Sequence, residues 1–167
     1  MAKGMASVPA IAQYLKAAHA YGIDYQPILE SSGISALDIQ DNASHISITA
    51  MEKLLALLID ASGDNCFGLY AAKFVEPASY SVLGYISLSC STLREAQTLI
   101  PLYETIVGDM GVTTIEYGRD FVFQRWHCQF IDPLVKRHQV EHVLASWATY
   151  SKTFLKFNAP ASVWFEH

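Results

Sequence analysis

The sharpest chemical pattern in the sequence is one segment that carries two histidines and a glutamate. It reads His138-Gln139-Val140-Glu141-His142, the H-x-x-E-H arrangement of inverted zinc peptidases. Histidines at i and i+4 share a helix face, so both can bind one Zn²⁺ while the glutamate activates a water. A catalytic zinc also needs a third protein ligand, and after this segment Glu166 is the only carboxylate side chain. A zinc hydrolase is therefore one hypothesis, and a solvated or partner-facing helix side is the other.

A second candidate for chemistry is the β-rich run over residues 121–130. Because neighbours in a strand point to opposite faces, Phe123, Arg125 and His127 share one face. An apolar wall with a few convergent polar groups is typical of a small-molecule pocket, in which Arg125 would hold a carboxylate or phosphate. The alternatives are a plain hydrophobic core and an exposed strand charge. The residues that we predict to line a ligand pocket are Arg125, His127, Tyr85, Tyr103, Trp126 and Tyr150.

Other catalytic signatures are absent from the sequence. It contains no G-x-S-x-G elbow, no P-loop and no G-x-G-x-x-G fingerprint. The three cysteines, Cys66, Cys90 and Cys128, are far apart and form no C-x-x-C pair, which argues against a zinc knuckle or a disulfide framework. We therefore expect no catalytic residues, no metal and no cofactor, and a reducing compartment.

Composition narrows the class of protein. The chain has 167 residues, of which 51% are hydrophobic and 16% charged, with a net charge of −5. This length suits one domain, and the apolar content excludes disorder. The acidic balance argues against nucleic-acid binding by this chain alone, since backbone binding needs clustered Lys and Arg. No run of about 20 apolar residues exists, and no signal peptide is visible at the start, so we expect a cytoplasmic protein with no membrane partner.

The first two thirds of the chain predict helices. Short helices joined by glycine turns fill the first forty residues. Thr49 is expected to cap a helix that ends at about Ser62. Thr92 and Glu95 form a capping-box pattern for a long helix to about Val107. Pro101 lies inside that helix and predicts a kink or a break.

The last third predicts a small sheet with a helix against it. A hairpin is expected over about residues 112–130, with Gly118-Arg119-Asp120 as its link. Asp132-Pro133 begins a long helix over about residues 133–157, and a last strand at about 161–166 is able to join the hairpin. The predicted fold class is thus α+β and mostly helical, with a small antiparallel sheet packed by a long helix, in a single domain over residues 1–167.

Three segments of the sequence resemble a known family. They are Gly63-Asp64-Asn65-Cys66-Phe67-Gly68-Leu69, the block from Leu83 to Ala96 (LGYISLSCSTLREA), and Phe130-Ile131-Asp132-Pro133 with the later Pro160, Val163, Phe165 and His167. In this order they resemble the N-terminal effector domain, arabinose-binding by family name, of AraC-type bacterial transcription regulators. The branch resembled is that of ornithine and arginine regulators.

The resemblance implies a function for the chain. Members of the family carry a cytoplasmic, ligand-sensing and often dimerising domain, followed by a C-terminal pair of helix-turn-helix units that this chain lacks. We therefore expect a non-enzymatic sensing domain with three partners: a small-molecule effector of unknown identity, a second copy in a homodimer, and DNA only through the missing half. A module that dimerises without an effector is the alternative. Under the resemblance, His138 and His142 are incidental to function.

Overall fold

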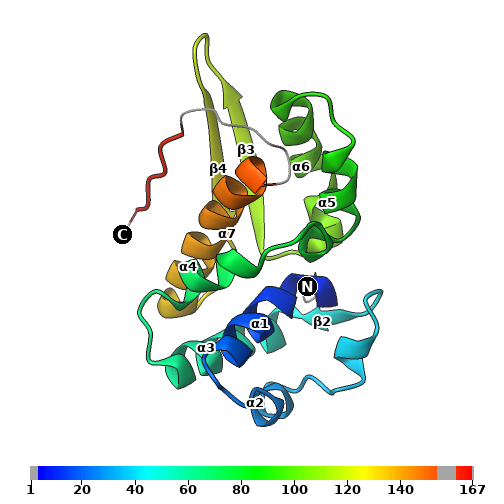
Figure 1. Ribbon diagram of the computed structural model, residues 1–167, viewed down its shortest axis with the longest axis vertical. Helices are drawn as coiled ribbons and strands as arrows, with labels where there is room; N and C mark the ends of the chain where they lie inside the picture. Colours follow the sequence, from blue (N-terminus) through cyan, green and yellow to red (C-terminus); the bar gives the residue numbers. More distant parts are fainter. Residues whose placement is uncertain (1–3, 154–160, 167) are drawn as a thin grey trace.

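The computed structural model describes residues 4–153 and 161–166 and has an α+β fold that is mainly helical (Figure 1). The longer helices are α1 (Ala12–Ala20), α3 (Ile48–Ser62), α5 (Ser81–Leu88), α6 (Leu93–Val107) and α7 (Pro133–Thr153). Two short helices are α2 (Gln26–Ser31) and α4 (Phe67–Ala71), and a 3₁₀ turn, η4 (Pro77–Tyr80), precedes α5. The strands are β1 (Met5–Ser7), β2 (His45–Ser47), β3 (Gly111–Tyr117) and β4 (Val122–Cys128). The predicted fold class is confirmed.

Helix starts follow the capping chemistry of the sequence, with one shift. The side chain of Thr92 accepts a hydrogen bond from the Glu95 backbone N–H at 3.1 Å, as expected for the start of α6. Helix α3 begins two residues earlier than predicted, because Ser47 rather than Thr49 is its N-cap and accepts from the Ala50 N–H at 3.1 Å. A kink or a break was expected at Pro101; helix α6 continues past this residue, so there is no break.

The strands form two antiparallel pairs. Strand β1 pairs with β2 from Met5↔Ser47 to Ser7↔His45. The hairpin of β3 and β4 runs from Gly111↔Cys128 to Tyr117↔Val122, so the predicted hairpin is confirmed. The expected last strand is wrong, since residues 161–166 form no strand. Trp164 instead lies against the side of the hairpin, with its ring 6.3 Å from that of Phe123. The predicted end of the long helix, at residue 157, lies outside the described residues.

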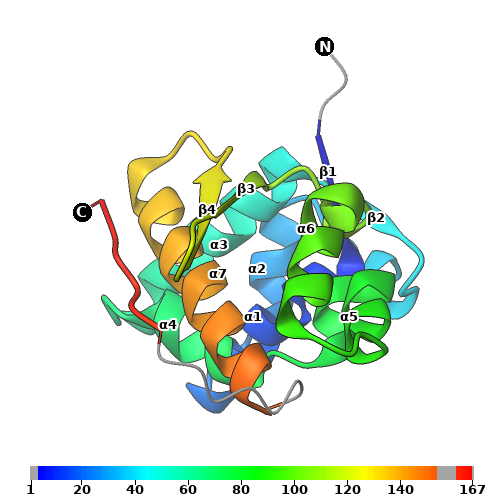
Figure 2. The ribbon, with the colours of Figure 1, turned by 90° about the horizontal axis from the view of Figure 1, so that it is seen from above.

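The hydrophobic core is concentrated in one half of the molecule. Fully buried side chains from α1, α3, α4 and the start of α7 meet there, among them Tyr14, Leu54, Leu58, Phe67 and Val135. In Figure 1 these helices form the lower half, and α5, α6, the hairpin and the end of α7 form the upper half. Figure 2 shows α7 passing between the hairpin and the α5–α6 pair. Among the 15 residues of α6 only Ala96 and Val107 are buried, so this helix contributes little to the core.

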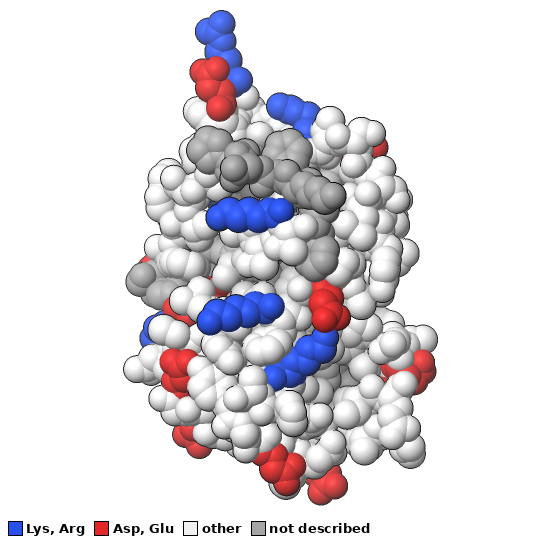
Figure 3. Space-filling view, viewed as in Figure 1, with Lys and Arg blue, Asp and Glu red and all other residues white. Residues whose placement is uncertain are grey.

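The charged side chains are scattered on the face that Figure 3 shows. Lys and Arg are interspersed with Asp and Glu there, and most of that face is uncharged. Within residues 4–153 and 161–166, no helix has the length and apolar character needed to cross a membrane.

Candidate ligand-binding site

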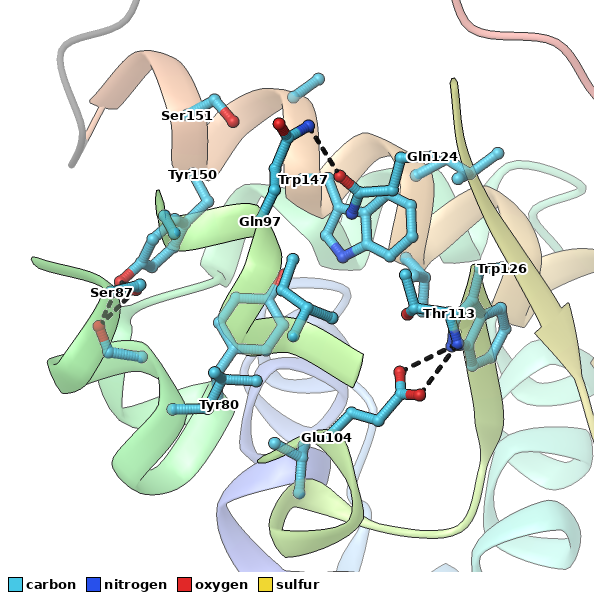
Figure 4. Close-up of a pocket in the computed structure, with 18 of the residues that line it drawn as sticks. Tyr80, Ser87, Gln97, Glu104, Thr113, Gln124, Trp126, Trp147, Tyr150 and Ser151 are labelled. Carbon is cyan, nitrogen blue, oxygen red and sulfur yellow. Dashed lines mark hydrogen bonds between the residues drawn. The ribbon is translucent and has the colours of Figure 1, made fainter. Parts of the chain in front are cut away.

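A cavity of about 810 Å³ lies in the upper half, between α5, α6, the hairpin and α7 (Figure 4). Three elements each turn one stripe of side chains into it. In α6 the stripe includes Ala96, Ile100 and Glu104, at helical spacing. In β4 every second side chain lines the cavity. In α7 the lining side chains recur about once per helical turn around Trp147. Residues 161–163 also lie in the wall. The volume is in the range of small-molecule sites, roughly 300–1,000 Å³.

Aromatic side chains supply much of the wall. Trp126 from β4 and Trp147 from α7 face the cavity, and Tyr80 and Tyr150 close its other end (Figure 4). Trp126 can lie flat across β3 because position 111 is a glycine: a Cβ on Gly111 would be 2.3 Å from the indole ring. The rings of Tyr80 and Tyr150 meet edge to face at 5.4 Å. Rigid aromatic walls of this kind bury a large ligand surface.

Two pairs of hydrogen-bonded polar side chains line the cavity. One pair lies at the end closed by the tyrosines, and the other joins α6 to β4. The hydroxyls of Ser87 and Tyr150 are 2.9 Å apart, and the Tyr150 hydroxyl also donates to the Gly84 carbonyl at 2.5 Å. Burial raises the pKa of Tyr150, so its phenol is neutral near pH 7. The amide of Gln97 donates to the Gln124 side-chain carbonyl at 3.0 Å and ties α6 to β4.

The third polar group is a carboxylate. Glu104 on α6 accepts hydrogen bonds from the Thr113 backbone N–H at 2.9 and 3.1 Å. The side chain of Thr113 is buried with it, since the residue is only 3% exposed. Its hydroxyl has no hydrogen-bond partner among the described residues. Glu104 and Thr113 therefore form a polar corner in an otherwise aromatic wall (Figure 4).

The structure brings together two of the predicted ligand-binding residues, Trp126 and Tyr150, in the wall of this cavity. The other four do not line it. Arg125 and His127 point to the opposite face of the hairpin, where Arg125 donates to Glu116 at 2.9 Å and His127 faces the Thr114 hydroxyl at 3.3 Å. Tyr85 and Tyr103 are exposed on the outer sides of α5 and α6. The predicted alternation along β4 is thus present, but the cavity lies on the Trp126 face because α6 and α7 pack there.

Residues 22–167 match the family described as the arabinose-binding domain of AraC transcription regulator, N-term. The chain belongs to this family. No curated protein matches the chain. The resemblance seen in the sequence is therefore confirmed at the level of the family, which is a ligand-sensing regulatory domain of AraC-type regulators.

The H-x-x-E-H segment has a structural place in this arabinose-binding domain. His138 and His142 are each 3% exposed, so the expectation of a solvated helix side is wrong. The Gly68 N–H donates to His138 Nδ1 at 3.2 Å, and His142 Nδ1 lies 3.3 Å from the Gly68 carbonyl. Both histidines therefore hold α7 against α4. In the part of the chain that the structure describes, no three His, Cys, Asp or Glu side chains are grouped to hold a metal.

Several residues in the wall of the arabinose-binding domain's cavity were not predicted from the sequence. They are Glu104, Thr113, Gln97, Gln124, Trp147 and Tyr80. The alternation of side chains along β4 could have predicted Gln124, which is on the same strand face as Trp126. The hydrophobic periodicity of α6 is misleading, because Leu102 is 69% exposed whereas Glu104 lines the cavity. Hydrophobicity alone would place Leu102 inside and Glu104 outside.

Proposed function

We propose that this domain binds a small-molecule effector in the cavity and thereby controls DNA binding by a C-terminal pair of helix-turn-helix units. The cavity itself carries the proposal. It has a volume of about 810 Å³ and a wall that is mostly apolar and aromatic with a few polar groups, which is the usual form of a small-molecule site. A sensing domain needs such a site, whereas dimerisation alone does not.

The proposed contacts follow from the wall of the cavity. Trp126 and Tyr150, both predicted from the sequence, would contact the effector together with Trp147, Gln97 and Gln124. Arg125, His127, Tyr85 and Tyr103 lie outside this wall and are left out of the proposed effector contacts. The family is named for arabinose, but a sugar needs hydrogen bonds to each of its hydroxyls, and most of this wall is apolar or aromatic. We therefore favour an effector with an apolar body.

A route for the signal is provided by residues 161–163. Ala161, Ser162 and Val163 are part of the wall, and Trp164 lies on the outer face of the hairpin against Phe123. An effector in the cavity contacts this segment as well as α6 and α7. An effector that favours one placement of the segment would shift the population of domain arrangements by its differential affinity for the two.

The remaining parts of the proposal follow the family. One domain spans residues 1–167, it forms a homodimer in the cytoplasm of a bacterium, and it contacts DNA only through the C-terminal half of the regulator. The branch that we propose is that of ornithine and arginine regulators, which the ordered set of segments resembles. The branch name does not identify the effector.

A fluorescent dye and a cavity-filling variant test the proposal. The neutral apolar dye N-phenyl-1-naphthylamine is expected to bind with increased fluorescence and to raise the melting temperature by mass action. Ala148→Trp, which projects an indole into the cavity from α7, is expected to weaken dye binding. Ala61→Trp, at an exposed position of α3, is the matched control and should leave it intact.

A panel of amino acids, fatty acids, sugars and aromatic acids is then screened for displacement of the dye and for a raised melting temperature. Circular dichroism of both tryptophan variants establishes that they are folded. If the dye binds equally well to Ala148→Trp, or if no compound binds the wild-type domain, the effector hypothesis is wrong and the domain acts by dimerisation alone.

A further inference from the structure

Glu104 is an acidic side chain in the wall of the cavity, and its charge is poorly compensated. Its two carboxylate oxygens share a single donor, the Thr113 backbone N–H, at 2.9 and 3.1 Å. A carboxylate offers about four acceptor positions, so most of them are open to a ligand in the cavity. Of the ion pairs formed by the described residues, none involves Glu104. A positively charged ligand group can therefore pair with this carboxylate by charge-assisted hydrogen bonds.

Thr113 supports the carboxylate and is itself shielded from the cavity. The residue is 3% exposed, and its Oγ1 is buried without a hydrogen-bond partner in residues 4–153 and 161–166. A ligand in the cavity cannot reach an atom that has no accessible surface. The Glu104 carboxylate is therefore the acceptor that a ligand meets at this corner.

Trp126 completes the corner. Figure 4 shows its indole beside the Glu104–Thr113 pair. The face of an indole attracts cations, and the attraction is strongest where water is excluded. A carboxylate and an indole together favour a cationic donor, and they disfavour an anion, which Glu104 would repel.

The basic side chains near the cavity do not reverse this preference. Arg125 is on the far face of the hairpin, where it is paired with Glu116 at 2.9 Å. Lys152 lines the cavity but is exposed. It follows Ser151, which Figure 4 places at the other end from Glu104. Its charge is therefore screened by solvent.

We infer that the effector carries a cationic nitrogen, an ammonium or a guanidinium group, on an apolar body, and that Glu104 binds this group. The inference rests on the proposed function, since it names the chemical class of ligand for the same cavity. The nitrogen donates to the free acceptor positions of Glu104, against the face of Trp126. The apolar body lies against Trp147 and the rest of the aromatic wall.

Three matched compounds test the charge of the ligand. They are 2-phenylethylamine, 2-phenylethanol and 3-phenylpropionate, which present an ammonium, a hydroxyl and a carboxylate on the same aromatic body. Their affinities are measured by displacement of N-phenyl-1-naphthylamine and by calorimetry at pH 7. A charge-assisted hydrogen bond predicts that the amine binds about tenfold more tightly than the alcohol. The carboxylate is expected to bind most weakly.

The variant Glu104→Gln removes the charge and keeps an oxygen for the Thr113 N–H. It is expected to reduce the affinity for the amine to that for the alcohol, to leave the alcohol unchanged and to improve binding of the carboxylate. The matched control is Glu116→Gln, which neutralises an exposed acid on the other face of the hairpin and should change none of the three affinities.

The outcomes separate the two proposals. If the dye binds in the cavity but the amine is not preferred, the inference is overturned while the proposed function stands. The same holds if the preference survives Glu104→Gln. If Glu104→Gln does not fold, the order of the three affinities in the wild-type domain decides, and an amine that binds no better than the alcohol overturns the inference. If the dye binds Ala148→Trp as well as the wild type, the cavity is not the site and both proposals fail.

Discussion

At the scale of single residues, the most constrained group outside the cavity is His142. Its Nδ1 lies 3.3 Å from the Gly68 carbonyl, which can only accept, so Nδ1 carries the proton. Its Nε2 is 3.3 Å from both Gln13 Nε2 and Ser146 Oγ, which donate to it. The neutral ring is thus satisfied on both sides. Burial lowers the pKa of His142 to about 3, because the charged ring would lose its hydration.

This histidine predicts a stability that falls in mild acid. Its pKa is about 3 in the folded protein and about 6.5 in the unfolded chain, so between these values the unfolded state binds more protons. The contribution of His142 to the free energy of unfolding is therefore fully present above pH 6.5. It declines as the pH falls below that value, by up to about 1.4 kcal/mol per pH unit. Urea denaturation at pH 7, 6 and 5 measures this slope.

The variant His142→Gln is the control for the pH effect. It retains a donor and an acceptor but cannot titrate, so the slope between pH 5 and 6.5 is expected to flatten. Its stability at pH 7 should be lower by about 1–3 kcal/mol, because the amide cannot reproduce all three hydrogen bonds. Asp38, Asp41 and Asp64 have lowered pKa values and contribute only at more acidic pH, below their ordinary 3.8. An unchanged slope in His142→Gln would contradict the assignment.

At the scale of elements, Gly84 fixes how closely α5 approaches the turn before it. A Cβ on Gly84 would lie 1.9 Å from the Pro77 carbonyl oxygen, a contact with backbone that cannot move aside. In an unhindered helix Gly→Ala stabilises by roughly 0.5–1 kcal/mol. Here we expect Gly84→Ala to destabilise by about 1–3 kcal/mol and to weaken dye binding, since Gly84 lines the cavity.

The control for Gly84→Ala is Thr105→Ala, at an exposed position of α6. It improves helix propensity without a new contact and is expected to leave stability unchanged or slightly raised. Both variants are compared by their urea midpoints. If Gly84→Ala is as stable as the wild type, then α5 and the Pro77–Tyr80 turn are not held in this close contact.

Capping residues and side-chain periodicity predict most of the helices and strands. The cavity depends in addition on how these elements pack against each other. Capping residues and alternation predict α6 and the hairpin because each effect acts within a few residues. The strand expected at 161–166 fails because pairing depends on a distant edge, and Trp164 lies on the face of the hairpin instead. Likewise, alternation separates Arg125 from Trp126, but only the packing of α6 and α7 decides which of them faces the cavity. The inward position of Glu104 has no local signal at all.

At the scale of the whole molecule, the two halves differ in how they are stabilised. The lower half buries a continuous core around Leu54, Leu58 and Phe67. The upper half surrounds a cavity, and its helix α6 buries only two side chains. Local opening costs less where few apolar contacts must be broken. The half that holds the proposed effector is therefore expected to be the more dynamic one, on the timescale of hydrogen exchange.

Amide hydrogen exchange tests this division. Without ligand, amides of α5, α6 and the hairpin should exchange at least about tenfold faster than those of α3, because their opening free energy is lower by about 1.4 kcal/mol or more. Saturating N-phenyl-1-naphthylamine should slow exchange in α5, α6, the hairpin and the second half of α7. Helix α3 should respond little. Equal protection of α3 and α6 in the free protein would contradict this division, since the cavity would then cost the upper half no local stability.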